Sequence, residues 1–213
     1  MKKETVYQIK IELKGIRPPI WRRLQLPADC SMDAAADALL TAMGWSGYHL
    51  YAFRTKARHV EIPDPDAIDM PGTGFFASGG RPTPEDAAKA KLADFAKPGD
   101  KFVFDYDFGD GWAHAVTIEE SMLTDPFTAR KALCLTGKRA CPPEDCGGPH
   151  GYMKLLETLA NPDPEIEHNK ERVQWIGGDW DAEAFDAGEV NEVLASWKPD
   201  THTGMYKSCW DIE

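Results

Sequence analysis

Alternating apolar and polar residues at the start of the chain predict two β-strands. Residues 6–13 alternate with the period of a half-buried strand, and residues 20–26 resume the pattern after a break at residues 15–19. The prolines in that break cannot donate hydrogen bonds to a sheet. The pattern therefore predicts an antiparallel pair joined by a short turn. The residues expected to share one face of the second strand are Ile20, Arg22, Leu24 and Leu26.

The next segment changes from strand to helix periodicity. Ser31 is a suitable N-cap and Gly44 a suitable left-handed stop. Between them, apolar residues recur at helical spacing, which predicts an amphipathic helix. An aromatic-rich third strand is expected at Tyr48–Arg54.

Proline and glycine dominate the stretch from about residue 60 to 83, which we expect to be a long surface excursion. Thr83, followed by a proline and Glu85, is typical of a helix start, and this helix would carry Leu92 and Phe95.

A β-hairpin is predicted from Phe102 to Glu120, with its turn at residues 109–111. A three-residue turn with Gly111 in the left-handed conformation would place Phe108 opposite Trp112. This register gathers the aromatic residues and His114 on one face, whereas a two-residue turn would mix acids with apolar residues.

The last third of the chain shows three helical stripes, at residues 152–159, 163–176 and 190–197, and an irregular tail after residue 198. Strands in the first half with helices clustered later predict an α+β fold. We expect residues 1–213 to form a single domain, an antiparallel sheet with helices packed mainly on one side.

Composition and charge narrow the class of protein. The chain has 42% hydrophobic and 28% charged residues, an ordinary globular composition, with no run long enough to span a bilayer. The N-terminus has no apolar stretch typical of a secretory signal, so we expect a cytoplasmic protein. The net charge of −11 argues against a nucleic-acid partner, although a local basic patch stays open as an alternative.

Five strings occur in a characteristic order: GIRPPIWRRLQLP, MGWSGYHLYAF, FDYDFGDGWAHAVTIEE, CLTGKRACPPEDCGGPHGY and WIGGDWDAEAFDAGEVNEVL. With these spacings, the chain resembles the plasmid pRiA4b ORF-3-like family over about residues 6–194. Some members of that family are labelled passenger proteins of insertion elements. The resemblance implies a single α+β domain and an association with plasmids or mobile elements, and it brings no established activity with it.

Carboxylates and histidines near the hairpin are the first candidate site. Asp105 and Asp107 are two apart on a predicted strand, hence on one face, and Asp110 follows at the turn. Such carboxylates can bind a divalent cation, although a solvated outer face is the favoured alternative, since acids are common on exposed strands. His49 and His114 are each surrounded by aromatic residues, where an imidazole can be a ligand, a base or a hydrogen-bonded core residue. Trp112 shares the predicted face of His114.

Cysteines form a second candidate site. Cys134, Cys141, Cys146 and His150 are separated by six, four and three residues, and together could complete a tetrahedral zinc site, with His114 as an alternative fourth ligand. Because no C-x2-C pair is present and a reducing compartment disfavours disulfides, reduced thiols packed in a tight loop are the favoured alternative. Zinc or another divalent cation is therefore a candidate cofactor, with none certain.

The loop at residues 142–149 presents Glu144 and Asp145 between two prolines and two glycines. A rigid loop of this kind suits ligand binding, whereas the alternative is that its acids satisfy backbone donors at a helix start. If the loop only displays these acids, replacing both by alanine should leave the melting temperature nearly unchanged.

Two functions follow as hypotheses. The leading one is a binding module that holds a protein or a small polar ligand in a cleft between the hairpin turn, this loop and His49. The rival is a divalent-metal-dependent hydrolase or nuclease-like enzyme, in which Asp105, Asp107 and Asp110 hold the ion and Glu144 or His114 is the base.

Overall fold

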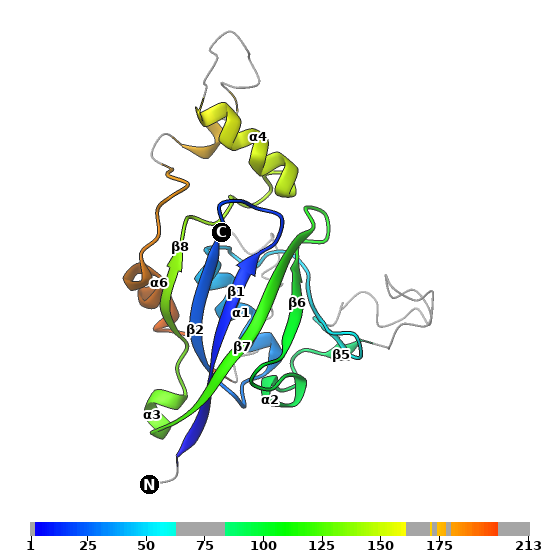
Figure 1. The fold of residues 1–213 in the computed structure, drawn as a ribbon, viewed down its shortest axis with the longest axis vertical. Coiled ribbons are helices and arrows are strands. Elements are labelled where there is room, and N and C mark those ends of the chain that lie inside the picture. The colour runs from blue at the N-terminus through cyan, green and yellow to red at the C-terminus, as the bar shows by residue number, and fades with distance from the viewer. Residues whose placement is uncertain (1–2, 63–83, 161–170, 172–173, 178–179, 200–213) are drawn as a thin grey trace, which may run out of the picture.

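Eight strands form one sheet that positions the rest of the molecule (Figure 1). The computed structural model describes residues 3–62, 84–160, 171, 174–177 and 180–199. The strands are β1 (Glu4–Leu13), β2 (Trp21–Pro27), β3 (Tyr51–Arg54), β4 (His59–Glu61), β5 (Glu85–Asp86), β6 (Lys101–Tyr106), β7 (Trp112–Thr124) and β8 (Leu133–Lys138). Their order in the sheet is β5-β4-β3-β6-β7-β1-β2-β8, and all neighbours are antiparallel except β4 and β5.

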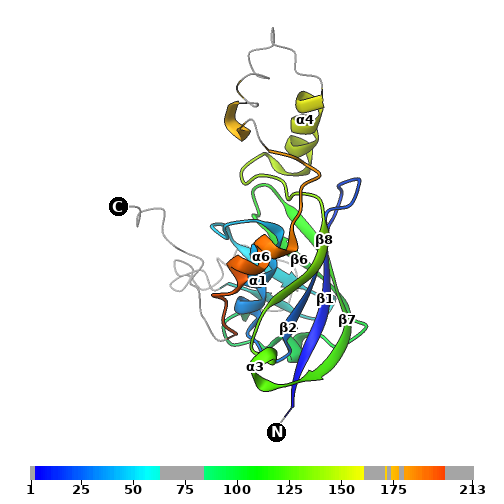
Figure 2. The same cartoon turned by 90° about the vertical axis from the view of Figure 1, so that its left-hand side faces the viewer.

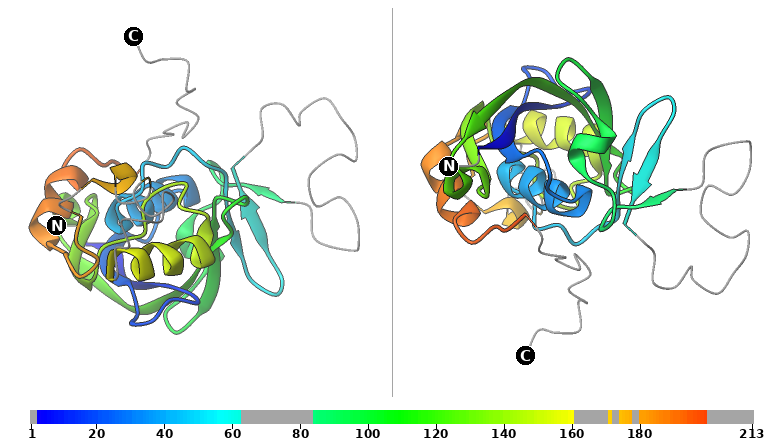
Figure 3. Two further views of the ribbon diagram at one scale, coloured as in Figure 1. Left: turned by 90° about the horizontal axis from the view of Figure 1, so that it is seen from above. Right: turned by 90° about the horizontal axis from the view of Figure 1, so that it is seen from below.

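The labelled helices are α1 (Met32–Met43), α2 (Leu92–Phe95), α3 (Pro126–Ala129), α4 (Gly148–Ala160) and α6 (Ala187–Leu194). The sheet curves around α1, and α6 lies beside α1, whereas α4 stands beyond one end of the strands (Figures 2 and 3). The predicted α+β single-domain class is therefore confirmed. No helix in the described ranges is long and apolar enough to cross a membrane.

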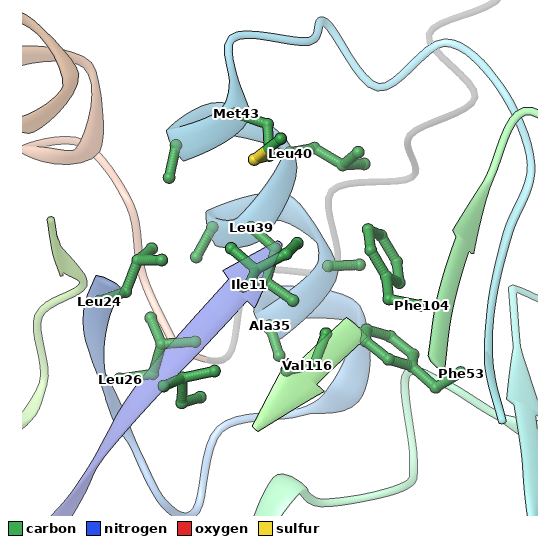
Figure 4. Packing of buried hydrophobic residues seen from close by; sticks show 14 of the residues in the cluster. Ile11, Leu24, Leu26, Ala35, Leu39, Leu40, Met43, Phe53, Phe104 and Val116 are labelled. Atoms are coloured by element: carbon green, nitrogen blue, oxygen red, sulfur yellow. The ribbon is translucent and has the colours of Figure 1, made fainter. Parts of the chain in front are cut away.

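The core fills the space between the sheet and α1. Ile9 and Ile11 of β1 and Leu24 and Leu26 of β2 are almost fully buried, as the alternating pattern predicted, and their strands pair antiparallel. They pack against apolar residues of α1 such as Leu39 (Figure 4). Each buried aliphatic side chain contributes about 1.5–3 kcal/mol.

Both ends of α1 are capped as the sequence predicts. The Ser31 hydroxyl accepts a hydrogen bond from the Ala34 amide, and Gly44 has a φ of 106°. The helix has no basic residue in its last turn, but the guanidinium of Arg22, from β2, donates to the carbonyls of Ala42 and Met43. A buried cation thus lies at the negative end of the helix dipole.

The hairpin of β6 and β7 differs in register from the prediction. Tyr106, not Phe108, lies opposite Trp112. The strand ends early because Asp107 has a φ of 51° and its carboxylate accepts hydrogen bonds from two amides of the turn. A slip of two residues keeps the paired side chains of β6 and β7 on their predicted faces, so the aromatic face and the left-handed Gly111 are as expected, whereas Asp107 and Phe108 lie beyond the end of the strand.

Three elements were predicted incorrectly. The third strand begins at Tyr51 rather than Tyr48, and the predicted helix start at Thr83–Glu85 is wrong because Glu85 and Asp86 form β5 beside β4. Strand β8 was not predicted, and it forms because β2 offers it an unpaired edge. Residues 63–83 of the expected excursion, residues 163–170 and 172–173 of the expected helix at 163–176, and the tail from residue 200 lie outside the described residues. Residues 171 and 174–176 of that expected helix are helical, as predicted.

Candidate functional site

Three segments meet beside one end of the sheet and bring four polar side chains together. His49 follows α1, Asp107 follows β6, and Glu144 and Asp145 lie in the loop before α4. From the Nε2 atom of His49, the nearest carboxylate oxygens lie 3.2 Å away on Asp145, 3.8 Å on Asp107 and 4.0 Å on Glu144. We call these four residues the His49 cluster.

Two of these carboxylates belong to residues with unusual backbone conformations, which direct the side chains into the cluster. Asp107 and Asp145 have φ values of 51° and 55°, in the left-handed region where aspartate is tolerated better than most residues. The Asp107 amide donates to the carbonyl of Leu50, which ties the end of β6 to the segment that carries His49. The conformations of the two aspartates cost free energy, of the order of 1–3 kcal/mol each, that the surrounding contacts offset.

Close packing between the hairpin turn and the loop holds the cluster together. The Gly147 amide donates to the Asp110 carboxylate at 3.1 Å. A Cβ atom on Gly148 would lie 2.2 Å from the carbonyl oxygen of Asp110, so only glycine allows this approach. On the other side of the loop, the indole of Trp45 donates to the carbonyl of Pro142 at 2.9 Å.

Glu144 is anchored through one carboxylate oxygen only. Its Oε1 atom accepts hydrogen bonds from the amide and the hydroxyl of Ser46 and from the hydroxyl of Tyr106, each at 2.9 Å. Burial and the Glu144 carboxylate raise the pKa of Tyr106 well above its ordinary value, so this phenol stays a donor. The Oε2 atom is buried without a hydrogen-bond partner among the described residues.

The cluster has the composition and spacing of a cation site. Ligand atoms of His49, Asp107 and Asp145 all lie within 4.8 Å of one another, and no other group in the described ranges meets this criterion. The Asp107 side chain is 10% exposed, whereas that of Asp145 is 72% exposed, so the cluster opens to solvent on the Asp145 side. One imidazole with carboxylates suits divalent ions such as Mn²⁺, Fe²⁺ or Zn²⁺.

The predicted trio of hairpin carboxylates does not come together. Asp105 pairs with Arg54, and Asp110 binds the Gly147 amide. Asp105 and Asp107 do not share a face, because β6 ends at Tyr106 and the backbone turns at Asp107.

Trp112 and His114 lie in the core, beneath the cluster rather than in it. Both are fully buried, and the rings of both contact Trp45. The Nδ1 atom of His114 is 3.0 Å from the carbonyl oxygen of Phe104. Burial lowers the pKa of His114 to about 4, so the imidazole is neutral at physiological pH.

The cysteines and His150 do not form a ligand set among the described residues. Cys134 is buried in β8, and Cys134, Cys141 and Cys146 are free thiols. Burial raises the pKa of Cys141 well above its ordinary value and that of Cys146 to about 12. Protonated thiols are poor metal ligands.

The sequence reasoning missed Ser46, Tyr106 and Trp45 as supporting residues. A signal for the first was present, since Ser46 is the polar residue between Trp45 and Gly47 in the string MGWSGYHLYAF. Tyr106 was assigned only to the apolar face, because a strand pattern does not show where a phenol oxygen ends.

Comparisons with known proteins agree with this architecture. The model of a family described as "Plasmid pRiA4b ORF-3-like protein" matches residues 5–189. The chain is 32% identical over 191 residues to "Uncharacterized protein y4hQ" of Sinorhizobium fredii (strain NBRC 101917 / NGR234), covering 89% of this chain and 91% of that protein. It also matches the crystal structure of a protein of unknown function, MM3350, from Methanosarcina mazei Go1. That match has a TM-score of 0.71 and 32% identity, and covers 88% of this chain and 98% of that one.

Proposed function

The chain belongs to the plasmid pRiA4b ORF-3-like family, and we propose that it is a binding module that takes up a divalent cation in the His49 cluster. The observation that carries the proposal is the convergence of His49, Asp107 and Asp145, with their ligand atoms within 4.8 Å of one another. These residues come from three separate segments, so their meeting is a product of the fold.

Electrostatics support a cation here. The cluster gathers the carboxylates of Asp107, Glu144 and Asp145 around one imidazole. Like charges at this spacing repel, and a divalent cation would offset that repulsion while taking the imidazole nitrogen as a further ligand.

A small polar ligand is the partner that such a site would recruit. Three protein ligands leave coordination positions free, and the exposed side of Asp145 opens them to solvent. A ligand with a carboxylate, phosphate or hydroxyl oxygen would complete the coordination sphere. We further propose a cytoplasmic location, and a plasmid or mobile-element setting on the strength of the family's description.

Glu144 favours a second candidate function, a divalent-metal-dependent hydrolase. Its Oε1 atom is held by three donors while Oε2 is left buried near His49, which suits a general base. Glu144 would accept a proton from a cation-bound water, and the water oxygen would bond to the electrophilic atom of the substrate. The leaving group would then depart with the proton.

Metal titration of matched variants tests the binding proposal. Protein stripped with chelator would be titrated calorimetrically with Mn²⁺, Zn²⁺, Mg²⁺ and Ca²⁺. Asp107→Asn keeps an oxygen for the turn amides but removes the charge, and His49→Gln removes the imidazole. We expect one cation per chain and a loss of affinity of at least about 100-fold in each variant, since mutation of even an outer-shell partner costs about 10–100-fold.

Asp105→Asn is the control, because it removes a carboxylate next to the cluster but outside it. No saturable binding by the wild-type chain, or an equal loss in the control, would refute the cation site. For the hydrolase, Glu144→Gln should retain the cation yet lose turnover of bis(p-nitrophenyl) phosphate. If the wild-type protein shows no turnover at saturating cation, the hydrolase function is refuted and the binding function remains.

A further inference from the structure

Two adjoining hollows on the outer surface form a basic surface apart from the His49 cluster. The first, of about 470 Å³, is lined by residues of β3, β6 and β7, with the small side chains Val103, Ala113 and Ala115 among them. The second, of about 530 Å³, is lined by residues 12–17, Pro19 and Met153 of α4. Lys14 lines both hollows, so together they make one elongated surface.

Cations line this surface. Lys14, Arg54, Lys56 and Lys101 line the first hollow, and Arg17 joins Lys14 in the second; all five residues are exposed. We call them the basic track.

Among the described residues, only one of these five cations has an acidic partner. Arg54 is paired with Asp105, whereas Lys14, Arg17, Lys56 and Lys101 have no ion pair with any described residue. The one acid lining the second hollow, Glu12, is paired with Lys10. Four cations are therefore left for an external anion.

The track contrasts with the chain as a whole, which carries a net charge of −11. At physiological ionic strength, exposed charges more than about 8 Å apart are largely screened. An anion in the hollows would therefore be governed by the nearby cations, and the distant acids would weaken its binding without preventing it.

We propose that the basic track binds the phosphate backbone of a single-stranded nucleic acid. Two hollows joined at Lys14 match a chain of phosphates better than a single anion, and the small side chains leave room for a backbone to approach. A bilayer is flat and would meet protruding groups rather than recessed ones. The proposal goes beyond the cation site and does not depend on it.

Fluorescence anisotropy with a labelled oligo(dT) of about a dozen nucleotides tests it, since this length lies in the usual range of single-strand sites. Four phosphate contacts predict a slope of log affinity against log salt of about −2.8, and hence about 50-fold weaker binding at 200 mM than at 50 mM salt. Replacing Lys14, Lys56 and Lys101 by Gln should reduce the slope to about −0.7. Each single Lys→Gln change should reduce it by about 0.7, which keeps the test valid if the triple variant does not fold.

A matched control replaces the exposed Lys131, Lys138 and Lys198 by Gln, which changes the net charge equally but leaves the track intact. We expect it to bind as the wild type does. The proposal is overturned if the wild type does not bind the oligonucleotide at low salt, or if both triple variants lose affinity equally. Preferential binding of poly-glutamate would also overturn it and would identify an acidic protein as the partner.

Discussion

His114 should make the stability of this protein depend on pH up to about 6.5, above the ordinary pKa values of carboxylates. The imidazole is fully buried, and its Nε2 atom has no hydrogen-bond partner among the described residues. Burial lowers the pKa of His114 from 6.5 to about 4. The native state therefore holds this residue neutral over a pH range in which the unfolded chain protonates it.

The sign and size of the effect follow from linkage. Between pH 6.5 and about 4 the unfolded state binds more protons at this residue, so stability rises with pH in this window and falls as acid is added. A pKa shift of this size corresponds to a contribution of about 3 kcal/mol to the free energy of unfolding. By pH 5.5 we expect a loss of about 1 kcal/mol of stability relative to pH 7.5 from His114 alone.

Urea unfolding at several pH values, with His114→Gln beside the wild type, isolates this contribution. The variant should be less stable at pH 7.5, and its deficit should shrink by about 1 kcal/mol at pH 5.5, because glutamine does not titrate. His150→Gln, at an exposed position, should follow the wild type throughout. A deficit of His114→Gln that stays constant from pH 7.5 to 5.5 would refute the assignment.

The remaining predictions concern the contacts that hold the loops and the sheet edge. Gly148→Ala should destabilise by about 2 kcal/mol or more in urea unfolding and weaken cation binding, because its Cβ would meet a carbonyl of the hairpin turn. Asn191→Ala should cost about 1–3 kcal/mol, since the Asn191 amide bonds both the N–H and the carbonyl of Cys134 on β8; Asn191→Asp should recover only part of this loss. Glu144→Ala should lower the melting temperature by several degrees, against the sequence-based expectation of no change, because three donors lose their acceptor. Asp145→Asn, which tolerates the same left-handed backbone, should leave the melting temperature nearly unchanged, so equal effects of the two changes would contradict the assigned roles.

The local pattern of apolar, polar and capping residues was sufficient to predict much of the fold. The faces of β1 and β2, and both caps of α1, were predicted correctly because each depends on residues that are neighbours along the chain. The hairpin face was also correct, while its register was not, because a slip of two residues leaves hydrophobic burial unchanged. The register is set by the Asp107 carboxylate, which accepts hydrogen bonds from two amides of the turn.

The candidate site, unlike these elements, could not be predicted from local pattern. The sequence by itself determined the α+β class, the faces of the main strands, and the gathering of unusual polar residues in a few strings. Only the tertiary structure decided that His49, Asp107 and Asp145 meet, that Asp105 and the cysteines do not, and that β8 closes one edge of the sheet. Periodicity encodes which side of an element is buried, because burial repeats along the chain. The position of a loop carboxylate depends instead on left-handed backbone conformations and on close contacts between distant segments, such as Gly148 against the hairpin turn.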